Sequence, residues 1–149
     1  MARNSLAALD ATGKPTSWDP SPDGDVNAIV TSSSKVVYVG GSFANVGGQA
    51  RSHLAAINAS GKATTWNPGA DGDVYCLGIG GTWVYAGGAF RTVATQTRNH
   101  LASVTTGGEA DRMESQRGRY GLLDVHTHLD HRGRWGLQER QRPAARLPC

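Results

Sequence analysis

The sequence lacks long apolar runs and has few cysteines, and each of these features argues against one class of protein. No stretch approaches the ~18 consecutive apolar residues of a membrane-spanning helix. The first ten residues, MARNSLAALD, lack the charged start and apolar centre of a signal peptide, and because they open inside a repeat we expect the natural start to lie upstream. Two cysteines, Cys76 and Cys149, do not predict a disulfide framework. The repeats also lack a phosphate loop, a CxxC pair and a nucleophile–base pair, so no catalytic residue is predicted in them.

Charge is nearly balanced over most of the chain. The whole sequence carries a net +3 and has a pI near 9.1. Residues 1–108 hold seven Lys/Arg against six Asp/Glu, whereas residues 109–149 hold eight arginines against six acidic residues. The near-neutral first part offers no electrostatic basis for binding nucleic acid. The arginines of the second part come without interleaved aromatic residues. We therefore expect no nucleic-acid partner.

The main feature of the sequence is a repeat. Arg3 begins a segment that reads RNSLAALDATGKPTSWDPSPDGDV and continues through KVVYVGGSF to Ala50. Arg51 begins a second, RSHLAAINASGKATTWNPGADGDV and then WVYAGGAF, and Arg98 begins a third, RNHLASVTT. The period is 48 residues and then 47. Self-similarity at this length predicts a solenoid, a propeller or another array.

Each repeat holds four short apolar segments that we predict to be strands. They are 6–9, the residues leading to Trp18, 26–31 and 36–41 in the first repeat, and 54–57, the residues leading to Trp66, 74–79 and 83–88 in the second. Gly-bearing turns separate them, and short polar turns make the last two segments of each repeat a β-hairpin. Four strands in about 48 residues is the size of one propeller blade. No segment shows the 3.6-residue period of an amphipathic helix.

The glycine and aromatic positions agree with stacked sheets. Gly pairs such as Gly40-Gly41 lie inside predicted strands, where glycine weakens the ladder unless another backbone approaches closely. The strands carry mainly small apolar residues, so the large aromatic side chains of Trp18, Trp66, Phe43 and Phe90 are expected to supply buried area. An alternative is that some of these rings are exposed platforms for a sugar.

This repeat unit resembles a known family. The LAALDATG-like strand, the W-[DN]-P loop, the DG-V start and the VYVGGSF-like strand are similar to the delta-60-type β-propeller repeats of bacteria and to propeller repeats of fungal cell-surface proteins. The resemblance covers residues 3–108. It implies an all-β propeller-like fold in a large secreted or surface-attached protein and no general activity. The predicted division is repeat 1 at 3–50, repeat 2 at 51–97, the start of repeat 3 at 98–108, and a tail at 109–149.

The tail breaks the repeat in a way that indicates a change of reading frame. Met113 stands where the spacing of Trp18 and Trp66 from their repeat starts predicts a tryptophan. Methionine has the single codon ATG and Glu114 begins with G, so a frame one nucleotide later reads TGG, tryptophan. In that frame the codons allowed for the following residues spell NPNADGTVY, and those from Arg134 can spell GGDFKSVNG. We therefore interpret residues from about 109 to 149 as an out-of-frame translation of a third repeat, and expect that tail to be disordered.

The tail also contains a motif that resembles a metal-binding site. LLDVHTHLDH resembles the amidohydrolase signature, in which His126 and His128 would face one way and bind one metal, with His131 or Asp130 as a third ligand. That family uses a barrel of roughly 250 residues with its other ligands on later strands. Only eighteen residues follow His131. A hydrolase using this pair is therefore the alternative, and adventitious Zn or Ni binding a further one.

Two features of the repeats could bind ions. Asp23-Gly24-Asp25 and its counterpart Asp71-Gly72-Asp73 place two carboxylates around a glycine turn, a weak similarity to a calcium loop, but the remaining spacing and the final Glu are absent. We interpret both as plain turns. His53 and His100 occupy equivalent positions without acidic or Cys neighbours in sequence, so we expect structural roles for them.

The resulting prediction is a non-catalytic binding or display scaffold without a cofactor. It would consist of two four-stranded blades and the start of a third, from a secreted or cell-surface protein. Its partner would be a protein or glycan that the sequence does not identify, and open blade edges could allow self-association. Besides the hydrolase, the alternative is a propeller enzyme whose active residues lie in further blades.

Overall fold

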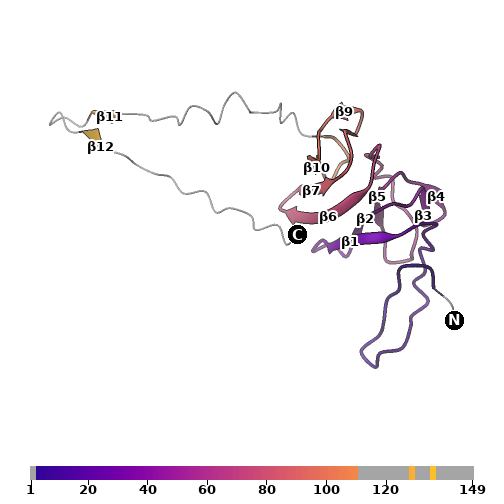
Figure 1. The fold of residues 1–149 in the computed structure, drawn as a ribbon. Helices are drawn as coiled ribbons and strands as arrows, with labels where there is room; N and C mark the ends of the chain where they lie inside the picture. Colours follow the sequence, from indigo (N-terminus) through magenta and orange to yellow (C-terminus); the bar gives the residue numbers. More distant parts are fainter. Residues whose placement is uncertain (1–2, 111–127, 130–134, 137–149) are drawn as a thin grey trace. The chain divides into compact units, whose positions relative to one another are not determined.

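The computed structural model describes residues 3–110 and, further along, the backbone of two short strands at 128–129 and 135–136. These residues are all-β (Figure 1). No helix occurs among them, so none is available there to cross a membrane. The strands are β1 (Val26–Thr31), β2 (Val37–Gly41), β3 (Asn45–Val46), β4 (Gln49–Ala50), β5 (Leu54–Ile57), β6 (Val74–Gly80), β7 (Trp83–Gly88), β8 (Thr92–Val93), β9 (Gln96–Thr97), β10 (Leu101–Thr105), β11 (His128–Leu129) and β12 (Trp135–Gly136).

Two antiparallel three-stranded sheets form the main body. The first sheet has the order β1-β2-β5 and the second the order β10-β7-β6. In each sheet the ladder slips at the start of its first strand, between Val26 and Ala28 and between Val74 and Cys76. The same irregularity at equivalent positions shows that the repeats share their backbone pairing as well as their composition.

The sheets cross the boundaries of the sequence repeats. Each takes its first two strands from one repeat and its third from the next, since β5 follows Arg51 and β10 follows Arg98. The predicted hairpins and the strand at 54–57 are confirmed. The strand predicted before Trp66 is reduced to one bridge, between Ile57 and Ala63. The chain turns away there because the Trp66 amide donates to Thr64 Oγ1, 3.2 Å away, a local turn that competes with a ladder.

The predicted strand at 6–9 is also reduced to a bridge. Residues 6–16, which we call the N-terminal hairpin, are held by the Leu9–Pro15 bridge and by the Thr16 amide, which donates to the Ala8 carbonyl at 2.8 Å. No described strand pairs with the other edge of residues 6–9. The hairpin, drawn in indigo, projects from the sheets in Figure 1.

Two small ladders that the sequence pattern did not predict follow the Gly-Gly pairs. β3 pairs with β4 around Gly47 and Gly48, which have φ of 62° and 78°. β8 pairs with β9 around Ala94 and Thr95, at 50° and 62°. Positive φ at both central residues is the requirement of a tight two-residue hairpin turn, and the second repeat meets it without glycine.

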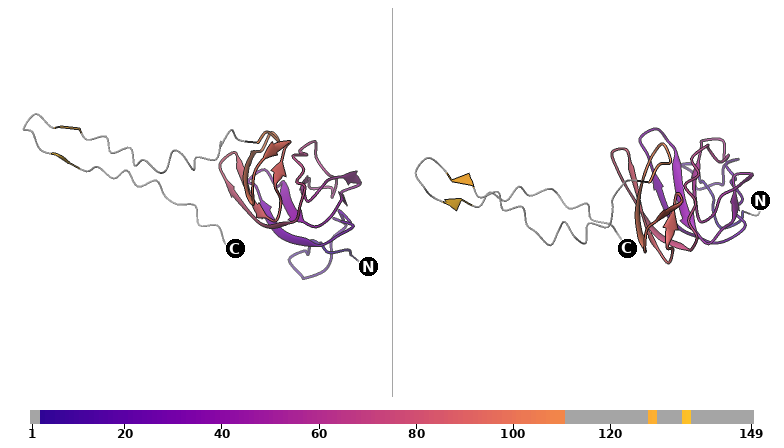
Figure 2. Two further views of the ribbon diagram at one scale, coloured as in Figure 1. Left: turned by 45° about the horizontal axis from the view of Figure 1, so that its top comes forward. Right: turned by 90° about the horizontal axis from the view of Figure 1, so that it is seen from above.

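The core lies in two layers of buried side chains, one on each side of the first sheet. Figure 2 shows the strands of the two sheets lying against each other. Buried residues of the first layer, which lies between the N-terminal hairpin and the first sheet, are Leu6, Val39, Phe43, Val46, Ala55 and Ile57. Buried residues of the second layer, which lies between the two sheets, include Tyr38, Leu54, Trp66, Leu77, Phe90 and Val104. The expectation of burial is confirmed for Phe43, Phe90 and Trp66, and these three rings are not exposed platforms for a sugar. Trp18 is only partly buried, since no described ring packs on it as Tyr38 packs on Trp66.

The later described strands form a separate short ladder. β11 pairs antiparallel with β12, with His128 opposite Gly136 and Leu129 opposite Trp135. The rest of the tail after residue 110 lies outside the described residues. Its interpretation as an out-of-frame translation, and its expected disorder, remain predictions.

Candidate functional site

The carboxylate of Asp23 is held by hydrogen bonds from the residues that follow β2. Its Oδ1 accepts from the amides of Ala44 and Asn45, both at 2.8 Å, and its Oδ2 accepts from the Asn45 side-chain amide at 2.6 Å. The side-chain amide of Asn45 and then the two backbone amides lower the pKa of Asp23 below its ordinary value. This carboxylate therefore fixes the loop after Trp18 to the end of β2.

The second repeat reproduces this contact. Asp71 Oδ1 accepts from the amides of Arg91 at 2.7 Å and Thr92 at 2.8 Å, and these two amides lower the pKa of Asp71. Within residues 3–110 no group of three or more His, Cys, Asp and Glu side chains could hold a metal ion. The hydrogen bonds of Asp23 and Asp71 thus give both loops the same structural role.

The tryptophans connect each unit to the next. Trp18 Nε1 donates to the Asn58 carbonyl at 2.9 Å, and Trp66 Nε1 donates to the Thr105 carbonyl at 2.8 Å. Tyr38 meets Trp66 edge to face, with ring centroids 5.0 Å apart, an arrangement that aromatic pairs favour. Both indoles therefore link neighbouring units by a hydrogen bond.

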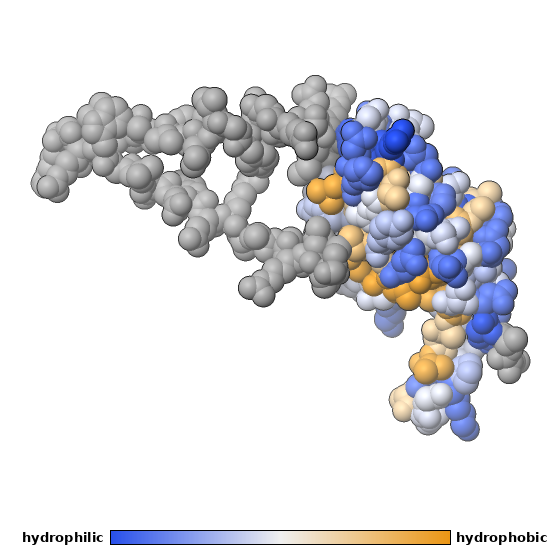
Figure 3. Space-filling model, in the orientation of Figure 1, coloured by the Kyte–Doolittle hydropathy of each residue, from blue (hydrophilic) through white to orange (hydrophobic). Residues whose placement is uncertain are grey.

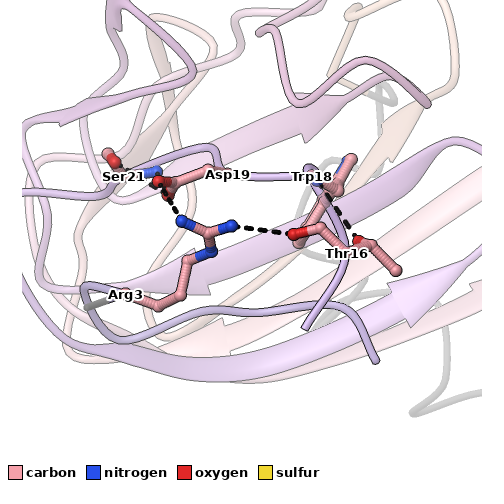
Figure 4. Close-up of polar contacts among 5 residues, drawn as sticks. All are labelled: Arg3, Thr16, Trp18, Asp19 and Ser21. Carbon is pink, nitrogen blue, oxygen red and sulfur yellow. Dashed lines mark hydrogen bonds and ion pairs between the residues drawn. The ribbon is translucent and has the colours of Figure 1, made fainter. Parts of the chain in front are cut away.

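The first arginine of each repeat anchors the loop that carries the tryptophan. Arg3 donates to the Thr16 carbonyl at 2.7 Å and to Asp19 Oδ2 at 3.1 Å (Figure 4). Arg51 donates to the Thr64 carbonyl at 2.7 Å. These guanidinium groups bind the chain itself, and the contact recurs with the repeat.

The repeated histidines also have structural roles. His53 and His100 have left-handed backbones, with φ of 63° and 65°, and each Nδ1 lies 3.1 or 3.0 Å from the carbonyl of Gly41 or Gly88. His53 Nδ1 also lies 3.5 Å from Asp73 Oδ1. A single carboxylate beside an imidazole does not make a metal site, so the structural interpretation is supported.

Gly40 lets the two sheets approach closely. A Cβ on Gly40 would meet Val74 Cγ1 at 2.5 Å and Leu77 Cγ at 3.3 Å, both in the second sheet. The other glycines of the two pairs are crowded by residues of their own repeat. The close approach of neighbouring sheets that the sequence predicted is therefore confirmed at Gly40.

One open groove runs where β1 and β6 lie side by side. It has a volume of about 780 Å³ and is lined by residues 27–30, 75–77 and 87–88. Its lining residues include no carboxylate, histidine or lysine. Tyr75, 56% exposed, is its most prominent aromatic side chain. Such a groove can contact a ligand but brings together no acid–base or nucleophilic pair.

The residues of the alternative metal site are not brought into any described site. His126 lies outside the described residues, and for His128 the structure describes only backbone, in β11. The amidohydrolase interpretation therefore gains no support from the geometry.

No protein family, curated protein or solved structure matches the chain. The resemblance to propeller repeats consequently remains an expectation from the sequence.

Sequence reasoning missed the features that distinguish the ends of the stack from its middle. Leu54 is fully buried but its counterpart Leu101 is 58% exposed, and Leu77 is 4% exposed but its counterpart Ile29 is 50% exposed. The repeat alignment pairs these positions, yet only the structure shows which copies have a neighbour.

Proposed function

We propose that the chain is part of a β-propeller-type array that serves as a rigid, non-catalytic binding or display scaffold in a larger secreted or cell-surface protein. Each unit would contribute one sheet, and a protein or glycan partner would bind the assembled surface. The groove between β1 and β6, with Tyr75 at its side, is the described surface best suited to such contact.

The observation that carries this proposal is that the two faces joined in the central interface recur, exposed, at the two ends of the described sheets. The interface between the two sheets buries Leu54 from one side and Leu77 from the other, and the same sequence positions are exposed at the two ends of the stack, at Leu101 and Ile29. A unit that buries a face only when a neighbour is present is the basic property of a repeat fold. Figure 3 shows apolar side chains, in orange, gathered on the surface of the described sheets.

A direct test is to add one unit in register. A variant in which residues 51–97 are duplicated between Thr97 and Arg98 gains one complete sheet and one more copy of the central interface. We expect a higher urea midpoint and a steeper transition than in the original chain, because nearest-neighbour interfaces add stability in repeat proteins. Circular dichroism and tryptophan fluorescence should report one coincident transition.

The matched control carries Gly87→Val in the first copy of the duplicated unit, where this glycine takes the place of Gly40 at the added interface. Valine there should prevent close approach of the sheets and remove the gain, because a Cβ on the equivalent Gly40 would meet Val74 Cγ1 of the facing sheet at 2.5 Å. An added unit that melts separately, at an unchanged midpoint, would rule out stacking.

A further inference from the structure

We propose that Asn58 is an attachment site for an N-linked glycan. It begins the exposed turn at residues 58–62, which follows β5. The donor would be an oligosaccharide linked to a polyprenyl pyrophosphate, because this inference rests on the secretory location in the proposed function. It adds a modification site to that scaffold.

The acceptor triplet occurs once in the sequence. Asn58-Ala59-Ser60 has the pattern that N-linked glycosylation requires, which is asparagine, any residue but proline, and then serine or threonine. No other asparagine of the chain begins such a triplet. The equivalent residues are Asp10 in the first repeat and Thr105 in the third. A pattern of this kind is short, so the setting of the Asn58 side chain decides whether the fold can accommodate a sugar.

The turn fixes the Asn58 side chain through its oxygen. Oδ1 accepts from the amide of Ser60 at 2.9 Å and from the amide of Lys62 at 3.1 Å. The Asn58 amide donates to the Lys62 carbonyl at 2.9 Å, and the Gly61 amide donates to the Asn58 carbonyl at 3.0 Å. Asparagine closes turns in this way by bonding to the backbone ahead of it. Because both partners of the side chain are donors, the atom that meets them is the oxygen.

The nitrogen of this side chain has no acceptor and reaches solvent. No hydrogen bond of Asn58 Nδ2 occurs within residues 3–110, and Nδ2 is not among the buried unpaired polar atoms of that part of the chain. Ala59 and Ser60 are both exposed. The turn thus presents the reacting nitrogen and the hydroxyl of the triplet on an open surface.

The exposure of this turn is not that of an end unit. Trp18 of the preceding repeat donates to the Asn58 carbonyl at 2.9 Å. In the following repeat, the Thr105 carbonyl accepts from Trp66 in the same way, at 2.8 Å. The repeats that precede and follow the turn are both in place and leave residues 58–60 accessible. Units stacked in the same way would therefore leave the site open in a longer array.

Glycosylation of this side chain would leave its turn intact. In the transfer, Nδ2 forms a bond to the anomeric carbon of the first sugar, the bond from that carbon to the pyrophosphate oxygen breaks, and polyprenyl pyrophosphate leaves. Nδ2 gives up a proton to a base of the transferase and keeps its other proton. Oδ1 takes no part and remains an acceptor for the amides of Ser60 and Lys62. The glycan and the turn therefore use different atoms of one side chain.

The first repeat shows that this turn needs only one side-chain oxygen. Asp10 Oδ1 accepts from the Thr12 amide at 2.8 Å, the Thr12 hydroxyl at 2.6 Å and the Lys14 amide at 3.0 Å. Asp10-Ala11-Thr12 becomes an acceptor triplet when its aspartate is replaced by asparagine. Asp10→Asn is therefore a matched variant that creates a second site in an equivalent turn.

The test expresses the full chain behind a secretion leader in eukaryotic cells. We expect one N-linked glycan per chain, seen as a gel shift that peptide N-glycosidase reverses, with Asn58 converted to aspartate in the mass spectrum. Medium and microsomes are both assayed, so a chain that the cell retains is measured as well.

Three variants locate the sugar. Ser60→Ala should carry no glycan and should fold, because Ser60 gives the turn only its backbone amide. Ser60→Thr keeps the triplet and should be modified as the original chain is. Asp10→Asn should carry two glycans.

A second measurement shows whether the folded chain accommodates the glycan. The urea midpoint of the purified glycoprotein is compared with that of the Ser60→Ala chain, which lacks the sugar and one hydroxyl. We expect equal midpoints, because both chains retain the hydrogen bonds of Asn58 Oδ1. A clearly lower midpoint for the glycoprotein would contradict the proposal, since the turn would then not tolerate the sugar.

Two results of the first experiment would also overturn the proposal. They are an original chain without a glycan on Asn58, and a glycan that persists in the Ser60→Ala variant. The duplicated variant contains the triplet twice and should carry two glycans. If that variant is stabilised while Asn58 stays unmodified, stacking stands and this inference alone fails. If Asn58 is modified but the added unit gives no stability, this inference stands and the stacking fails.

Discussion

At the scale of single residues, the repeats are held by side chains that bind backbone, and this makes part of the stability depend on pH. Asp23 and Asp71 collect backbone amides that would otherwise lack partners, and these bonds lower the pKa of both carboxyls. A lowered folded-state pKa means that the stabilisation is complete above the unfolded-state pKa of about 3.9 and is lost as the pH falls through the folded-state pKa.

Replacing one of these carboxylates should therefore flatten the acid side of the stability profile. Asp23→Asn is expected to lower the urea midpoint at pH 7 and to reduce the loss of stability between pH 5 and pH 2, because the neutral amide accepts hydrogen bonds less strongly than a carboxylate. Urea titrations at both pH values measure this. Asp25→Asn is the control, since no hydrogen bond of its side chain occurs within residues 3–110. An equal change in the two variants would contradict the assigned role.

Glycine makes a second prediction at this scale. A Cβ at position 88 would collide with the Asp73 carbonyl, whereas a Cβ on Gly80 would meet only the Tyr85 ring at 3.5 Å. Gly88→Ala is expected to destabilise the fold by about 3 kcal/mol, the upper end of the usual cost of overpacking. Gly80→Ala should change stability by less than about 1 kcal/mol. Thermal melts of the two variants, read against the original chain, compare these costs.

At the scale of strands and sheets, burial depends on whether a neighbouring unit is present. Leu54 and Leu101 begin equivalent strands, β5 and β10, and have equivalent partners in the ladder, Gly40 and Gly87. They differ because the second sheet covers the first, and no described sheet covers that face of the second. From the repeat alignment alone, the two leucines would be expected to contribute equally to the free energy of unfolding.

The two leucines should therefore respond differently to truncation. Leu54→Ala is expected to cost about 3 kcal/mol, as buried leucines do, and Leu101→Ala less than about 0.5 kcal/mol. Denaturant titration gives both values. Similar losses for the two variants would mean that the exposed face of the second sheet is covered in solution.

The hairpins, the glycine contacts and the buried aromatic residues could be predicted because local rules fix them. Turn residues define β1–β2 and β6–β7, and glycine within a strand indicates close approach. The grouping of strands into sheets could not be read in this way, since β5 pairs with β2 across the repeat boundary and a period has no intrinsic starting point. The β8–β9 turn was missed because Ala94 and Thr95 adopt positive φ without the usual glycine. The exposure of Ile29 could not be predicted either, because it depends on whether another sheet packs on β1 and not on the local sequence.

At the scale of the whole molecule, the units are interlocked in series. The indole of each unit donates to a carbonyl of the next, as Trp66 does to Thr105, and Asn27 Nδ2 of β1 donates to the Val74 carbonyl at 3.0 Å. Contacts of this type link nearest neighbours only, so the stability of the array should grow with each added unit. The duplicated variant proposed above tests this growth directly.

The offset between repeat and sheet also sets an order of events on the ribosome. The hairpin β1–β2 leaves the exit tunnel before β5, which belongs to the following repeat. The outer edge of β2 therefore stays unpaired until the first strand of the next repeat has emerged. Each newly made repeat completes the sheet started by the one before it. A pause when the chain has left the tunnel only as far as a repeat boundary would therefore leave an open sheet, and a pause after the first strand of the next repeat has emerged would leave a closed one.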